Sequence, residues 1–138
     1  MKKLYILLLI SSIALIFSSC NKELASTKPD LITSRLVNKN WYLDYSITGF
    51  VTKKFIGQPT YLITFLNDGS TKDSDGVSGY FTIIDNNGKY ELYVRAKTVN
   101  GNNFTFKHLI ESVGDEKMVL SFTEDGQTVK TSLYFTSK

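Results

Sequence analysis

The chain has 138 residues, a formal net charge of +3 and a single cysteine. This length suits one domain, and 13% aromatic residues with only two prolines indicate a packed β-rich fold and exclude disorder. One cysteine excludes an internal disulfide. The near balance of charges, without a clustered basic face, argues against nucleic-acid binding.

The first twenty residues have the three parts of a secretory signal. Lys2 and Lys3 form a basic region, residues 4–17 form an apolar region, and small residues precede Cys20. As a helix the apolar run would span roughly 21 Å, short of a ~30 Å hydrocarbon core, which argues against a transmembrane anchor. The remaining alternative is a soluble secreted protein in which Cys20 is a free thiol.

Residues 17–20, Phe-Ser-Ser-Cys, resemble the bacterial lipobox. The resemblance implies that residues 1–19 are a lipoprotein signal peptide and that Cys20 carries a diacylglycerol, with its new amine acylated as well. Cleavage would remove two lysines and no acidic residue, which lowers the formal charge from +3 to +1. Because two or three acyl chains such as palmitate anchor a protein stably, we expect the membrane to be a partner of this chain.

The residues after Cys20 bear on where such a lipoprotein would reside. Asn21, where an aspartate would signal retention at the inner membrane, favours the outer membrane of a Gram-negative bacterium. The periplasmic and surface faces both remain open. Residues 20–29 have no apolar period and are expected to be a lipidated tether.

Residues 30–138 are expected to form the folded domain. Asp30 is a candidate N-cap for a short helix that carries apolar residues at helical spacing up to Val37. From Trp41 onward the apolar period changes to 2, which is typical of β-strands. Strands separated by Gly, Asn and Asp turns are predicted over about residues 41–47, 50–56, 60–66, 70–75, 79–85, 90–97, 104–110, 118–122 and 129–135.

This succession of short strands predicts the fold class. Strands without intervening helices are expected to be sequential antiparallel neighbours. The prediction is therefore all-β: an up-and-down meander of eight or nine short strands, closed into a small barrel and preceded by a short N-terminal helix. A barrel is favoured over the alternative two-sheet sandwich because closure removes exposed strand edges.

The order of several motifs resembles the lipocalin-like domain of small bacterial lipoproteins. The resemblance rests on a helix before Trp41, on Thr-Phe-Leu-Asn-Asp-Gly at 64–69, on Gly-Tyr-Phe-Thr-Ile at 79–83 and on Met-Val-Leu at 118–120. It covers about residues 31–135 and implies a lipocalin-like β-barrel with an apolar cavity.

Two features of the lipocalin pattern differ in this chain. Lipocalins have a glycine two residues before the tryptophan and a late arginine that packs over its ring. Here Lys39 occupies the first position and no arginine follows Arg95. The motif therefore does not by itself imply a closed base for a ligand cavity.

The interior of an eight-stranded barrel is either filled by side chains or holds one small ligand. Rings dominate the residues that strand parity places inward, so we expect a mostly filled interior with a shallow pocket at one mouth. An apolar void above roughly 300 Å³ would overturn this expectation. The inward set is Trp41, Tyr45, Tyr61, Phe65, Phe81, Tyr90, Phe104, Phe106, Phe122 and Phe135, with Ala96 and Thr131 as its small members.

The candidate ligand-binding residues are Trp41, Tyr61, Phe106 and His108. His108, the only histidine, either contacts the polar group of a ligand or is a buried histidine satisfied by a backbone carbonyl or a hydroxyl group. Two functions are compatible with these residues. One is a carrier of a small apolar ligand; the other is a surface module that binds glycan or a partner protein through the outward aromatics Tyr42, Tyr93, Tyr134, Phe50 and Phe55.

No catalytic or metal-binding signature is present in the sequence. It lacks Gly-x-Ser-x-Gly, His-Glu-x-x-His and a phosphate-binding loop. The segment 73–76 is a fragment of a calcium loop without its glutamate, and the adjacent Glu124 and Asp125 cannot face each other across a cleft. We therefore expect a protein that is not an enzyme and has no cofactor, metal or nucleic-acid partner.

Overall fold

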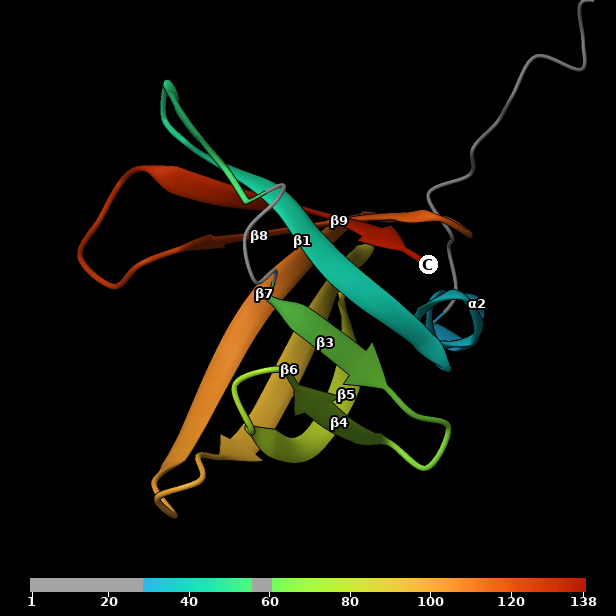
Figure 1. Ribbon diagram of the computed structural model, residues 1–138. Helices are drawn as coiled ribbons and strands as arrows, with labels where there is room; N and C mark the ends of the chain where they lie inside the picture. Colours follow the sequence, from blue (N-terminus) through green and yellow to red (C-terminus); the bar gives the residue numbers. More distant parts are fainter. Residues whose placement is uncertain (1–28, 56–60) are drawn as a thin grey trace, which may run out of the picture.

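The computed structural model describes residues 29–55 and 61–138 (Figure 1). The predicted signal peptide, Cys20 and nearly all of the tether lie outside these residues. Within the described part, one helix, α2 (Pro29–Leu36), precedes nine strands. These are β1 (Lys39–Thr48), β2 (Val51–Lys54), β3 (Leu62–Phe65), β4 (Ser70–Asp73), β5 (Ser78–Asn86), β6 (Lys89–Lys97), β7 (Asn103–Val113), β8 (Lys117–Thr123) and β9 (Lys130–Ser137).

Strand β1 closes the sheet on itself. Along one edge it pairs antiparallel with β9, from Trp41 opposite Ser137 to Thr48 opposite Thr131. Along its other edge it pairs first with β3 and then with β2. The remaining ladders join consecutive strands from β3 to β9, so β1 and β3–β9 form a closed eight-stranded antiparallel barrel. The prediction of a small all-β barrel after a short helix is confirmed.

The expectation that every strand neighbours the next one in sequence is wrong at one place. Strand β2 pairs only with the second half of β1, and β3 pairs with the first half of the same edge. Strand β2 is therefore an additional strand outside the barrel. Figure 1 shows its hairpin with β1 projecting beyond the barrel, on the same side as the hairpin of β8 and β9.

Helix α2 plugs one end of the barrel, where β1 begins (Figure 1). Its residues Ile32 and Leu36 are buried in the core. Asn38 ends the helix with a left-handed φ of 58°, which short polar residues tolerate. Because the helix begins at Pro29, the prediction that Asp30 is its N-cap is wrong; Asp30 lies in the first turn, where its charge complements the helix dipole.

Trp41 connects helix α2, which plugs one end of the barrel, to the barrel strands. Its side chain is fully buried, and its Nε1 donates a hydrogen bond of 2.8 Å to the carbonyl oxygen of Leu36. The last carbonyls of a helix have no partner within the helix, so this bond satisfies a group that burial would otherwise leave unpaired. Trp41 packs in one core cluster with Phe65, Met118 and Phe135.

A β-bulge in β1 changes which side chains face inward. Leu43 lies opposite Phe135, and the register then shifts so that Tyr45 lies opposite Tyr134. The rings of Tyr45 and Tyr134 stack with centroids 4.3 Å apart, while Leu43 and Phe135 belong to the core. The prediction that Tyr45 points inward is wrong, because one extra residue in a strand reverses the direction of the side chains that follow it.

Replacing Trp41 tests the connection between the plug and the barrel. We expect Trp41→Phe to lower the free energy of unfolding by about 1–3 kcal/mol, because it leaves the buried Leu36 carbonyl without a donor. Trp41→Ala should cost about 3–5 kcal/mol. Tyr42→Phe, at the next position, is the matched control and should change stability by about 0.5 kcal/mol or less. Urea unfolding measures all three; equal effects of the two phenylalanine variants would contradict this role of Trp41.

Candidate functional site

An apolar pocket of about 420 Å³ lies inside the barrel. It extends from Phe65 and Phe135, near the end plugged by α2, toward Tyr61 and Phe122 at the opposite mouth. Eight of its eleven lining residues are apolar. The lining residues are Tyr61, Ile63, Phe65, Leu92, Phe106, Lys107, His108, Leu120, Phe122, Leu133 and Phe135.

This volume exceeds the roughly 300 Å³ that marks the low end for ligand sites, so the expectation of a mostly filled interior is wrong. The bulge in β1 removes one of the rings that were expected inside. It places the ring of Tyr45 on the outer side, and Ser46 lies opposite Leu133, which lines the pocket. A small residue therefore faces the interior where parity had predicted a ring.

The structure brings together three of the four candidate ligand-binding residues. Tyr61, Phe106 and His108 all line the pocket. Trp41 is not among the lining residues, because its ring is packed at the plugged end against α2. The aliphatic part of the lining, such as Leu92 and Leu133, was not among the predicted site residues, although the alternation along β6 and β9 already indicated that these positions share one face.

The hydroxyl group of Tyr61 is already engaged within the protein. It donates a hydrogen bond of 3.1 Å to Oδ2 of Asp73, and burial together with the Asp73 charge raises the pKa of Tyr61 above its ordinary value. Oδ1 of Asp73 accepts the backbone N–H groups of Asp75 and Val77, which fixes the turn between β4 and β5. The described residues contain no group of three or more side chains able to hold a metal ion.

His108 is the polar group of the pocket that the protein leaves unsatisfied. Its Nδ1 is buried and has no hydrogen-bond partner among the described residues. The rings of Phe106 and Phe122 contact the imidazole edge-to-face, each with a centroid distance of 5.1 Å. The interpretation of His108 as a histidine satisfied by a carbonyl or hydroxyl group is therefore wrong for Nδ1.

The pocket around His108 is electrically neutral at pH 7. Burial lowers the pKa of His108 to about 4, so the imidazole is uncharged. Lys107 carries its ammonium group to the outer surface, where Nζ lies 2.8 Å from Oε1 of Glu91 and over the ring of Tyr93. The site can thus accept an apolar molecule that offers one hydrogen-bonding group to the imidazole.

The outward aromatics predicted for a surface module do not gather on one platform. Tyr134 stacks on Tyr45, and Tyr42 lies under the ammonium group of Lys138. Tyr93 lies on β6, whereas the other tyrosines lie on β1 and β9. Of the two phenylalanines, Phe55 is partly buried, and Phe50 is fully exposed at the tip of the hairpin of β1 and β2.

Comparison with known proteins adds no assignment to this geometry. No family model matches the sequence, and no curated protein matches it. In the part of the chain that the structure describes, none of the helices has the length and apolar character required to cross a bilayer.

The depressed pKa of His108 predicts a pH dependence of stability. An unfolded histidine titrates near 6.5, so between pH 6.5 and about 4 the unfolded chain binds a proton that the folded protein does not. The contribution of the neutral imidazole to the free energy of unfolding is therefore fully present above pH 6.5. It is lost as the pH is lowered through this window, and the free energy of unfolding is about 2–3 kcal/mol lower at pH 4.

The variant His108→Phe isolates this contribution. We expect its stability to depend less on pH than that of the parent protein, and to exceed it by about 1–3 kcal/mol at pH 7, because an unsatisfied buried nitrogen is removed. Urea unfolding at several pH values between 4 and 7.5 measures the difference. Parallel pH profiles for the two proteins would show that His108 is not buried in the neutral form.

Proposed function

We propose that the protein is a lipid-anchored carrier of the outer membrane that holds one small apolar ligand inside its lipocalin-like barrel. The buried Nδ1 of His108, unpaired in an apolar pocket of about 420 Å³, supports this proposal most directly. A buried polar atom without a partner costs about 1–3 kcal/mol. A ligand that hydrogen-bonds to Nδ1 removes this cost, so the pocket favours an occupant with a polar group at that point.

The lining defines the class of ligand. Eight apolar side chains favour an acyl chain or a ring system, since burial of apolar surface contributes about 25 cal/mol per Å². The neutral imidazole favours an uncharged polar group, such as a hydroxyl, amide or carbonyl group. A pocket of about 420 Å³ lies toward the lower end of the usual range for ligand sites, which indicates a small molecule.

Lipid anchoring through Cys20 makes the carrier a membrane protein of the outer envelope. The chain should incorporate radioactive palmitate in its own cells, and Cys20→Ser should abolish the label because the acylated thiol is removed. Ser18→Ala is the matched control and should keep the label, since it retains a small residue before the cleavage site. Label in the Cys20→Ser variant would contradict this attachment site.

Ligand binding is tested on a chain of residues 21–138 that lacks Cys20, purified from its own cells. The core cluster and every described strand lie within this segment. Native mass spectrometry should reveal a bound small molecule whose occupancy falls at least about fivefold in Leu133→Trp, because the larger ring fills the pocket.

Thr82→Trp is the matched control, because it adds the same ring to an exposed position on the outer face of β5. It should leave the occupancy unchanged. Adding an uncharged long-chain alcohol to the emptied protein should restore the bound state in the parent and in Thr82→Trp only. A protein that stays empty under both conditions would contradict the carrier and favour the surface module.

A further inference from the structure

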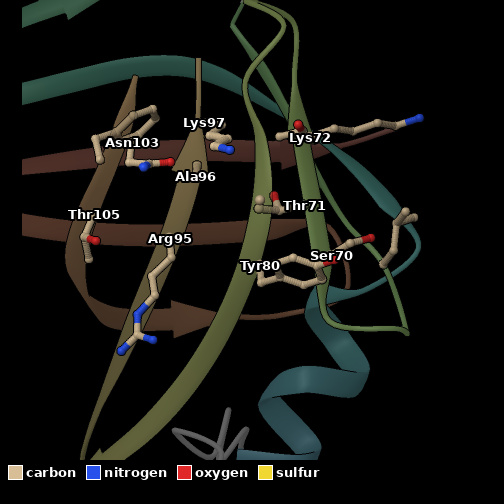
Figure 2. Close-up of a pocket in the computed structure, with 13 residues that line it drawn as sticks. Ser70, Thr71, Lys72, Tyr80, Arg95, Ala96, Lys97, Asn103 and Thr105 are labelled. Carbon is tan, nitrogen blue, oxygen red and sulfur yellow. The ribbon is translucent and has the colours of Figure 1, made fainter. Parts of the chain in front are cut away.

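A groove on the described surface lies outside the barrel, across β4, β5, β6 and β7 (Figure 2). It has a volume of about 740 Å³. Outward side chains cross it in two rows. In the first row Lys72 lies opposite Ser78, Ser78 opposite Lys97, and Lys97 opposite Asn103.

The second row contains the exposed aromatic residue of the groove. Tyr80 lies opposite Ser70 on one side and Arg95 on the other, and Arg95 lies opposite Thr105. The side chain of Tyr80 is 71% exposed. Figure 2 shows Tyr80 on β5 between Ser70 and Arg95, with the long side chain of Arg95 extending from β6.

The charges of the groove are of one sign. Lys72, Arg95 and Lys97 line it, and none of its thirteen lining residues is acidic. In the described part of the chain none of these three cations forms a salt bridge, whereas Lys39, Lys107 and Lys130 each pair with a carboxylate. Within residues 29–55 and 61–138, the positive charge of the groove is therefore not neutralised by an ion pair.

Gly79 forms part of the groove lining by its backbone. A Cβ atom at this position would clash with the carbonyl oxygen of Arg95 and with the backbone of Ala96. Strands β5 and β6 approach so closely here that only glycine fits. Polar hydroxyl and amide groups also line the groove.

We propose that this outer groove binds an acidic polysaccharide. Arg95, Lys97 and Lys72 pair with its carboxylate or sulfate groups, and Tyr80 stacks on the apolar face of a sugar ring. Charge-assisted hydrogen bonds from arginine to such oxyanions are strong and directional. The small side chains of Ser78 and Thr105 offer hydrogen bonds to sugar hydroxyl groups. This proposal does not depend on the ligand inside the barrel.

The pairing of the strands favours a glycan over a peptide. Strands β4–β7 each have neighbours on both sides, so an extended peptide cannot add to the sheet at this groove. The single exposed ring also distinguishes the groove from a site for single-stranded nucleic acid, where several aromatic side chains stack on successive bases.

Binding is measured with the full-length chain in non-ionic detergent micelles, by biolayer interferometry against immobilised polysaccharides. The probes are chondroitin sulfate, polygalacturonate and neutral dextran. Single-stranded oligothymidylate is a fourth probe, because it is a polyanion but not a polysaccharide. We expect binding to at least one of the two acidic polysaccharides, no binding to dextran, and weaker binding at higher salt.

Substitutions in the groove locate the site. Arg95→Gln with Lys97→Gln should weaken binding at least about tenfold, and Tyr80→Ala should weaken it several-fold while Tyr80→Phe restores it. Lys117→Gln and Phe50→Ala alter an exposed cation and an exposed ring elsewhere, and they should not change the affinity. All variants should keep the parent's unfolding midpoint, since these side chains are exposed.

Three results would overturn the proposal. The first is no binding to either acidic polysaccharide. The second is an equal loss of affinity in the groove variants and in the control variants. The third is binding of oligothymidylate with the same dependence on Arg95 and Tyr80, which would show a general polyanion surface.

Discussion

The antiparallel pairing of β1 with β9 is the constraint on which the rest of the structure depends. These strands are far apart in the sequence, and their ladder from Trp41 to Thr48 converts an open meander into a closed barrel. Closure satisfies the backbone of the first and last barrel strands and creates an interior separate from solvent. At one end α2 and Trp41 seal this interior, and the pocket extends toward the other end.

Because the sheet is closed, each barrel strand has one face toward the interior and one face toward solvent. Along β7, Phe106 and His108 line the inner pocket, while Thr105 lines the outer groove. In the described part of the chain, Nδ1 of His108 has no hydrogen-bond partner in the inner pocket, and Lys72, Arg95 and Lys97 of the outer groove form no salt bridge. The buried nitrogen without a partner lowers stability, and a ligand that hydrogen-bonds to it would remove this cost.

Much of the fold follows from the local pattern of apolar and turn residues. The site, in contrast, depends on details that this pattern does not contain. Alternation and turn residues predicted each strand to within a few residues, because one apolar face per strand is a local property. Parity placed His108 and Tyr61 inside. It failed at Tyr45, because the bulge at Asp44 arises from pairing with β9, which local sequence does not specify. The volume of the inner pocket likewise depends on how strands that are distant in the sequence meet.

His108 offers the most direct test of the central claim, that a neutral imidazole is buried in an apolar pocket. It is the only histidine in the chain, so the imidazole nitrogen resonances of the ¹⁵N-labelled protein report on it without ambiguity. The account predicts that the imidazole stays neutral as the pH falls from 7 to 5 and becomes protonated only near pH 4, close to its pKa in the pocket. A titration midpoint near the ordinary value of 6.5 would contradict it, because an imidazole with that pKa would be exposed to water.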